Sequence, residues 1–193
     1  MLKRSFKRYN TDCVKFDALK KIFGTDDVIP LWVADMDLAC PRPVVRALRK
    51  RISHPIYGYS LQNDCFYKSI RTWIKDQFSW EVEKEWITCT PGIVAAINIA
   101  VMTMTEKGDE ILVQTPVYFP FFTAVTDHDR VLVKKPLKEE NCHYSMDFED
   151  LKKKITKKTK MIILCSPHNP VGRVFTKEEL QELGDLCLKN KII

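Results

Sequence analysis

The side chains best suited to chemistry lie in turns that follow short apolar segments. Residues 166–172 read Ser-Pro-His-Asn-Pro-Val-Gly. The amide of Asn169 both donates and accepts hydrogen bonds, and it stands between two prolines that fix its backbone. An Asn-Pro turn without any ligand accounts for the same residues. Because ligands of open α/β sheets bind where strands end, Asn169 is also a candidate ligand-binding residue.

A second turn, Thr90-Pro91-Gly92, precedes an apolar, alanine-rich segment that begins at Ile93. Free amides at a helix N-terminus, together with the helix dipole, form an anion site, and a glycine lets the anion approach the backbone. A buried helix with a glycine near its first turn explains the residues equally well. The turn lacks the Lys-Ser/Thr pair of a nucleotide-binding loop.

Two further groups invite a chemical interpretation. Asp35 and Asp37 end the strand-like segment 31–37, and paired carboxylates suit acid–base or metal chemistry. Prolines follow closely, however, and Asp is common in turns, so a turn is the better interpretation. Tyr118 belongs to an aromatic cluster, 118–122, which in the simplest interpretation fills a core.

The elements that must position these residues alternate between strand and helix. Thr176 and Glu179 form a capping box that begins a helix directly after the 166–172 turn, so strand, turn and helix make half of a βαβ unit. Residues 189–193 then resemble the start of another parallel strand, which suggests a fragment. We expect a mostly parallel sheet with helices on both faces and strands at 86–89, 110–114, 130–134 and 160–165.

Apolar residues at helical spacing predict two further helices with one face in a core. The first carries Val44, Val45, Leu48 and Ile52, and the second carries Phe66, Ile70, Trp73, Ile74 and Phe78. We expect residues 1–42 to form a separate arm or small-domain segment. Residues 43–193 are expected to form an incomplete part of a larger domain.

Composition limits the class of protein. The chain has 193 residues, 45% of them hydrophobic and 29% charged, which suffices for one domain with a core. The net charge of +6 derives largely from lysines at 152–160, a pattern typical of a solvated helix end, so no nucleic-acid partner is predicted. The seven cysteines are widely spaced, so neither a metal site nor a disulfide framework is predicted. With no signal-like apolar region and no run of about 20 apolar residues, we expect a cytoplasmic location and no membrane partner.

Four stretches in order resemble the class I/II aminotransferase superfamily of fold-type I enzymes that use pyridoxal 5′-phosphate (PLP). They are 32–37, 57–60, 90–97 with 115–118, and 164–176. Within the superfamily, Trp-Val-Ala-Asp-Met-Asp at 32–37 resembles the cystathionine β-lyase-like C–S lyases. The resemblance implies the α/β fold of PLP-dependent transferases, a three-layer α/β/α arrangement with a mostly parallel sheet, here truncated to its N-terminal half.

The resemblance also implies roles at the cofactor. The backbone amides of Gly92, Ile93 and Val94 are expected to bind the PLP phosphate. Tyr118 is expected to stack on the pyridine ring, and Asn169 to donate to the phenolic oxygen of PLP and to lie near the substrate carboxylate.

Two more residues take implied roles from the same resemblance. Tyr59 is expected to reach the phosphate of the partner subunit in a homodimer. Ala34 is a candidate for a backbone contact with the substrate.

The implied reaction is β-elimination from an amino acid such as cystathionine or a cysteine-like substrate, giving pyruvate, ammonia and a thiol. The lysine that bonds to PLP and the acid that contacts its ring nitrogen match no residue here, so we predict no catalytic residue in this chain. An aminotransferase on the same fold is the first alternative. A non-catalytic truncated fragment is the second.

Overall fold

The computed structural model describes residues 6–193. The chain divides into two compact units, Met1–Phe66 and Tyr67–Ile193. The boundary falls within α4 (Asp64–Phe78), near the start of that helix. The three-stranded sheet belongs to the second unit.

The main sheet consists of β1 (Glu110–Thr115), β2 (Val131–Pro136) and β5 (Thr159–Ile163), in the order β2-β1-β5. Both pairings are parallel. The four central residues of β1 are buried, as expected for a strand covered on both faces. The strands predicted at 110–114, 130–134 and 160–165 are therefore confirmed to within two residues.

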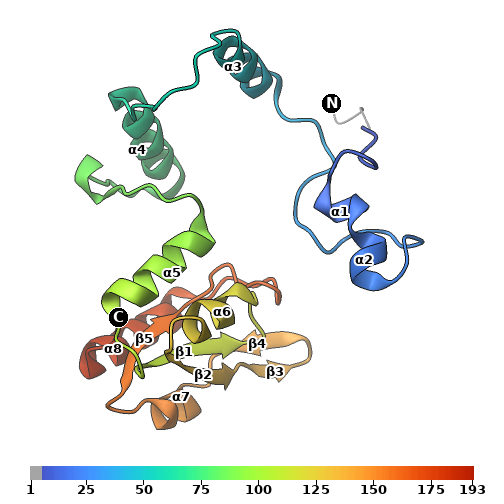
Figure 1. The fold of residues 1–193 in the computed structure, drawn as a ribbon. Helices are drawn as coiled ribbons and strands as arrows, with labels where there is room; N and C mark the ends of the chain where they lie inside the picture. The colour runs from blue at the N-terminus through green and yellow to red at the C-terminus, as the bar shows by residue number, and fades with distance from the viewer. Residues whose placement is uncertain (1–5) are drawn as a thin grey trace. The chain divides into compact units, whose positions relative to one another are not determined.

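Helices cover both faces of this sheet (Figure 1). Successive side chains of a strand point to opposite faces, and β1 follows this rule. Ile111 and Val113 pack with α5 (Ile93–Met104) and α6 (Pro120–Thr126). Leu112, between them, packs with α7 (Phe148–Lys154) and α8 (Lys177–Asn190). The predicted three-layer α/β/α arrangement is confirmed.

Local capping rules fix where the two helices of the second layer begin. The Asp147 carboxylate accepts a hydrogen bond from the Asp150 amide at 3.1 Å and starts α7. Thr176 and Glu179 form the predicted capping box at the start of α8. Between β2 and α7 the chain forms a hairpin of β3 (Lys138–Glu140) and β4 (His143–Ser145).

The last residue of the chain is hydrogen-bonded to β5. The Ile193 amide donates to the Lys160 carbonyl at 2.9 Å, and the Ile162 amide donates to the Ile193 carbonyl at 2.8 Å. This alternation is the hydrogen-bond pattern of a parallel pair. Residues 191–193 are not assigned to a strand, so the start of a further parallel strand here stays a prediction.

The strand predicted at 86–89 is wrong. Lys84–Trp86 form a short 3-10 helix (η1), and residues 87–90 have no regular structure. A strand needs a neighbour for its backbone hydrogen bonds, and no strand among residues 6–193 lies beside this segment. The local sequence has strand character, but its pairing is missing.

Helix α3 (Arg42–Ile52) and α4 form as expected, but the prediction that their apolar faces lie in a core is wrong. Val45, Ile70 and Ile74 are half-buried, while the other apolar residues of both stripes are exposed, with Trp73 at 63%. Periodicity identifies an apolar face but not the element that covers it. No described element covers these two faces.

The remaining part of the first unit is built on two short helices, α1 (Val14–Asp17) and α2 (Leu19–Phe23). Leu19 is buried, and Gly24 ends α2 with φ 75°, a left-handed conformation that suits glycine. Within residues 6–193, no helix is both long and apolar enough to span a membrane.

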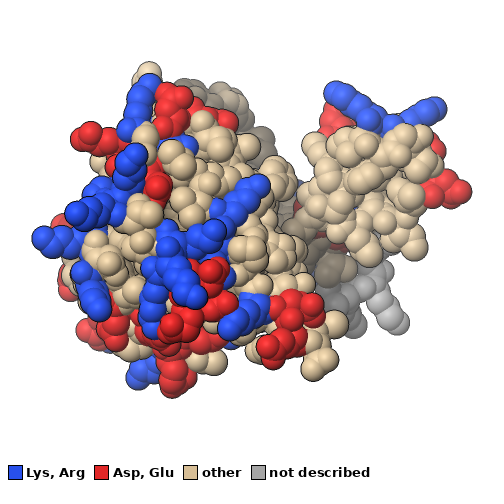
Figure 2. All heavy atoms as spheres, turned by 90° about the horizontal axis from the view of Figure 1, so that it is seen from below, with Lys and Arg blue, Asp and Glu red and all other residues tan. Residues whose placement is uncertain are grey.

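Positive and negative side chains are interspersed on the face shown in Figure 2. Within the lysine-rich segment, Lys152 lies 3.0 Å from Glu149 on its own helix and 3.5 Å from Glu182 on α8. Mixed pairing of this kind is typical of a solvated surface.

Candidate functional site

Two of the predicted site residues lie in loops that follow neighbouring strands. Tyr118 comes after the end of β1, and Asn169 comes after the end of β5. Because β1 and β5 are adjacent and parallel, both loops leave the same edge of the sheet. Nε2 of His168 lies 2.7 Å from the carbonyl oxygen of Pro116, which ties the loops together. The structure thus brings the segments carrying Tyr118 and Asn169 into contact.

The loop around Asn169 is closed by its own backbone. The His168 amide donates to the Arg173 carbonyl at 2.7 Å, and the Gly172 amide donates to the His168 carbonyl at 2.7 Å. Gly172 has φ 77°, in the region that favours glycine. The Asn169 side chain is exposed and makes no hydrogen bond to the described part of the chain. A fixed turn therefore presents an amide that can bind a ligand.

The Tyr118 ring packs against neighbouring aromatic rings and is partly exposed to solvent. The ring makes an edge contact with the buried Phe121, at 6.2 Å between centroids and an interplanar angle of 81°. It also makes a tilted contact with Phe119. Tyr118 nevertheless keeps 37% of its surface exposed, so its ring is available for an aromatic ligand.

The third predicted element, the N-terminus of α5, lacks a side-chain cap. The Ala96 amide donates to the Gly92 carbonyl at 3.0 Å, but the amides of Ile93 and Val94 precede the first helical acceptor. Gly92 has φ 165° and ψ 167°, an extended backbone open to any residue, and an added Cβ would meet nothing within 4 Å. The fold itself therefore does not require glycine at 92. The free amides and the open space above them fit a bound anion.

Helix α5 runs back toward the edge of the sheet where both loops lie. Its C-terminal end adjoins the start of β1, and Ile97 and Val101 pack against the core beside β1. Twelve residues of helix span about 18 Å, close to the length of a six-residue strand. We therefore expect Gly92 to lie toward the carboxyl ends of the strands. Convergence of Gly92, Tyr118 and Asn169 on one cavity remains a prediction.

Ala34 and Tyr59 belong to the first unit, so their roles toward this site stay predictions. Both residues are exposed. The backbone beside Ala34 is well fixed, because the Lys15 ammonium donates to the Asp35 carbonyl at 3.0 Å and Arg8 donates to the Met36 carbonyl at 3.2 Å.

The two acidic residues of the same segment are paired with cations. Arg8 forms ion pairs with Asp35 and with Asp37, and Nζ of Lys15 lies 3.0 Å from Asp37. The Lys15 and Arg8 hydrogen bonds lower the pKa of Asp37. These partners account for both carboxylates without a ligand, while the preferred interpretation as a turn is not confirmed, since residues 35–37 are not assigned to a turn. Among residues 6–193, no group of three or more potential metal ligands comes together.

Sequence reasoning missed the residues that hold the Asn169 loop. His168 ties it to β1, and Arg173 ties its other end to α8. Nη1 of Arg173 lies 3.1 Å from Oε1 of Glu179, and the same nitrogen donates to the Tyr144 carbonyl. The Arg173 guanidinium also lies over the Phe175 ring at 4.6 Å. Only the fold brings His168 to a partner 52 residues away.

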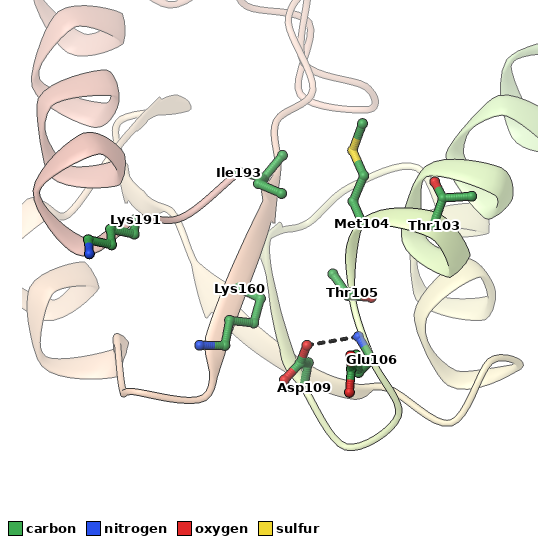
Figure 3. A pocket seen from close by; sticks show the side chains of 8 residues that line it. All are labelled: Thr103, Met104, Thr105, Glu106, Asp109, Lys160, Lys191 and Ile193. Carbon is green, nitrogen blue, oxygen red and sulfur yellow. Dashed lines mark hydrogen bonds between the residues drawn. The ribbon is translucent and has the colours of Figure 1, made fainter.

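A cavity of about 430 Å³ lies at the opposite end of the sheet. Figure 3 shows the side chains that line it. The cavity lies where β1 and β5 begin, and its lining includes Asp109, Lys160 and Lys191. The Glu106 amide donates to the Asp109 carboxylate there at 2.8 Å. None of the predicted site residues lines this cavity, so we place the candidate site at the carboxyl edge.

Comparison with known proteins places this arrangement in a family. The Aminotransferase class I and II family model matches residues 26–193. The chain is 40% identical over 187 residues to the cystathionine beta-lyase PatB of Bacillus subtilis (strain 168), covering 96% of this chain and 48% of that protein. The chain thus spans about half the length of this curated relative.

Solved structures of two proteins that contain PLP are similar to this chain. A PLP-bound putative aminotransferase from Clostridium difficile 630 superposes with a TM-score of 0.94 at 40% identity, covering 99% of this chain and 49% of that one. Cystalysin from Treponema denticola, whose structure contains PLP, gives a TM-score of 0.93 at 34% identity over 100% of this chain and 50% of that one. Because the family model matches residues 26–193 and these solved structures superpose on nearly the whole chain, this protein belongs to the class I and II aminotransferase family.

Proposed function

We propose that this chain contributes the phosphate-binding and ring-binding half of a PLP-dependent C–S β-lyase. The observation that carries the proposal is the 40% identity to a cystathionine beta-lyase over nearly the whole chain. Two structural neighbours that contain PLP support the choice of cofactor. The chemistry of the candidate site residues is compatible with this cofactor.

The residues present fit PLP group by group. The uncapped amides of Ile93 and Val94, with the open approach over Gly92, suit the phosphate dianion. The partly exposed ring of Tyr118 suits stacking on a pyridine ring. The exposed amide of Asn169 can donate to a phenolate oxygen. When bound, PLP supplies an electron-withdrawing ring that stabilises negative charge on the α-carbon of an amino acid.

The reaction we propose for the whole protein is elimination across the Cα–Cβ bond of a sulfur amino acid. The α-proton is removed, the Cβ–S bond breaks, and the sulfur leaves as a thiol. Water then releases pyruvate and ammonia. Residues of this chain would bind the cofactor and orient the substrate. Asn169 would lie near the substrate carboxylate, and the backbone of Ala34 would contact the substrate. We assign no proton-transfer role to any of them.

The proposal extends to assembly and location. We propose a homodimer, in which Tyr59 of one subunit donates a hydrogen bond to the phosphate held by the other. A phenol on an exposed segment suits such a reach, and Tyr59 is fully exposed. A cytoplasmic location is proposed because seven free cysteines suit a reducing compartment.

An aminotransferase is the second candidate, favoured by the structural neighbour described as a putative aminotransferase. The two reactions leave different products. A β-lyase releases a thiol, pyruvate and ammonia without a second substrate, whereas an aminotransferase needs a 2-oxo acid to accept the amino group.

The test uses this chain and a chimera in which the second half of the Bacillus relative follows Ile193. With PLP and cystathionine, the chain alone should give no pyruvate and no specific borohydride-fixed lysine adduct, because it carries no residue matching the cofactor lysine. The chimera should give both. Turnover by the chain alone contradicts the assignment of catalysis to the missing half, and a folded, inactive chimera favours the non-catalytic fragment. In a parallel assay of the chimera that also contains 2-oxoglutarate as the amino acceptor, amino transfer without pyruvate release selects the aminotransferase.

A further inference from the structure

His168 combines near-complete burial with a place directly beside an exposed candidate ligand-binding residue. Its exposed fraction is 1%, while Asn169 next to it is exposed. Both of its backbone polar groups are used, the amide toward Arg173 and the carbonyl toward Gly172. The ring packs edge-on against Phe175, at 5.6 Å between centroids and 89°. Backbone and ring together fix where the imidazole points.

One hydrogen bond of this imidazole leaves the loop. Nε2 lies 2.7 Å from the carbonyl oxygen of Pro116, and a carbonyl oxygen only accepts. Nε2 therefore carries the proton. Nδ1 is buried and has no partner among the described residues. A single N–H group thus makes the connection, and the other nitrogen adds nothing to it.

This bond acts where the sheet no longer holds the two segments together. Pairing of β1 with β5 ends at Val113 and Ile163. Beyond that point, the loop with Tyr118 and the loop with Asn169 need a separate connection. Arg173 secures the Asn169 loop only on the side of α8 and the hairpin. Cys165 packs against the core cluster that includes Val117, and among residues 6–193 the His168 bond is the hydrogen bond that spans from one loop to the other.

We propose that His168 is a positioning residue that holds Asn169 at a fixed separation from Tyr118. The inference rests on the proposed function, in which one cofactor ring stacks on Tyr118 and hydrogen-bonds to Asn169. Two side chains that must contact the same rigid ring bind it more tightly when their separation is set before binding. His168 needs no contact with the cofactor to have this effect.

Two variants of the 193-residue chain replace His168 by a residue with a side-chain amide. Together they separate the effect of the Nε2–H group from the effect of the aromatic ring. In His168→Gln the side-chain nitrogen reaches as far as Nε2 of histidine. In His168→Asn the same chemical group is one methylene shorter and does not reach Pro116. Both variants remove the aromatic contact with Phe175, so comparing them isolates the bond.

The first measurement is hydrogen exchange, which needs no ligand. His168→Asn should raise exchange about tenfold at residues 117–119 and 165–169, as expected for the loss of a hydrogen bond, while residues 111–113 of β1 stay unchanged. His168→Gln should stay within about threefold of the original chain.

The second measurement is binding of pyridoxine 5′-phosphate, which keeps the ring, the phenolic oxygen and the phosphate but has no aldehyde to react with lysines. Equilibrium dialysis should show about tenfold weaker binding to His168→Asn than to His168→Gln, with a smaller induced circular dichroism of the ligand ring. Equal exchange in the two variants, or a change confined to 165–169, overturns the proposal. If the original chain binds no ligand, the chimera with the second half of the Bacillus relative decides the proposed function, and exchange still decides whether His168 couples the loops.

Discussion

Arg173 and Glu179 form an ion pair across the start of α8, and it joins the Asn169 loop to the helix that follows it. Nη1 of Arg173 lies 3.1 Å from Oε1 of Glu179, and the second carboxylate oxygen accepts the Thr176 amide at 2.8 Å. One carboxylate therefore completes a capping box and anchors the loop at once. Charge and capping can be separated by substitution, because glutamine also serves in a capping box.

Glu179→Ala should lower the free energy of unfolding by about 1–2 kcal/mol, because it removes a cap and the anion opposite a partly buried guanidinium. Glu179→Gln keeps the cap and should cost about half as much. Urea denaturation followed by far-ultraviolet circular dichroism measures both. Glu178→Ala, one position earlier in the same helix, is the matched control. Equal losses for Ala and Gln would show that the charge, and not the cap, dominates.

Tyr118→Phe should leave binding of pyridoxine 5′-phosphate within about twofold, because the ring is kept and stacking depends on the ring. Tyr118→Leu removes the aromatic face and should weaken binding roughly fivefold, consistent with about 1 kcal/mol for an aromatic pair. Equilibrium dialysis supplies both constants. Phe119→Leu, on the neighbouring exposed ring, should have no comparable effect. Loss of binding in Tyr118→Phe would point to the hydroxyl and contradict simple stacking.

Low pH should loosen the segment that carries Ala34. Lys15 and Arg8 lower the pKa of Asp37, and backbone amides of Asn10 and Thr11 lower that of Asp17. A carboxyl group with a lowered folded-state pKa contributes stability above its unfolded pKa of about 3.9, and the contribution disappears as pH falls through the folded value. Hydrogen-exchange protection of residues 9–37, after correction for the intrinsic pH dependence of amide exchange, should therefore fall below about pH 4.

In Asp37→Asn, exchange of the same segment should already be raised at neutral pH and should depend less on pH below 4. Asp26→Asn is the control, since Asp26 is an exposed aspartate of the same unit with no ion pair to a described residue. An unchanged pH profile in Asp37→Asn would mean that its ion pairs do not hold this segment.

The sequence predicts those parts of the fold that depend on local rules. The capping residues Asp147 and Thr176 act as expected, and the continuous apolar run of β1 marks a strand buried on both faces. Where an element depends on a partner, prediction fails. Residues 86–89 have strand character, but no strand among residues 6–193 lies beside them, and no element in that range covers the apolar stripes of α3 and α4.

In the candidate site, too, local features are predictable from the sequence and long-range contacts are not. Sequence motifs identify Gly92, Tyr118 and Asn169, because turns and helix N-termini have local sequence signatures. They do not identify what holds these residues in place. The bond from His168 to Pro116 joins segments 52 residues apart, and only the parallel pairing of β1 with β5 brings them into reach. Long-range contacts between loops have no periodicity from which to infer them.

Gly92 provides the sharpest test of the anion site. Neither its backbone angles nor neighbouring atoms require glycine, so the fold should accept Gly92→Ala with a change in unfolding free energy of about 0.5 kcal/mol or less. A methyl group above the free amides of Ile93 and Val94 occupies the space an anion needs. Binding of pyridoxine 5′-phosphate should weaken about tenfold, as expected for one lost charge-assisted hydrogen bond.

Gly184→Ala is the matched control for that experiment. Gly184 lies within α8, and an added Cβ there also meets nothing within 4 Å. Because alanine has the higher helix propensity, this variant should gain roughly 0.5–1 kcal/mol of stability without any change in binding. If Gly92→Ala binds the ligand as tightly as Gly184→Ala does, the phosphate does not sit on the N-terminus of α5. Weaker binding in Gly92→Ala alone, with its unfolding free energy preserved, would locate the phosphate there, because the methyl group would then have disturbed the ligand and not the fold.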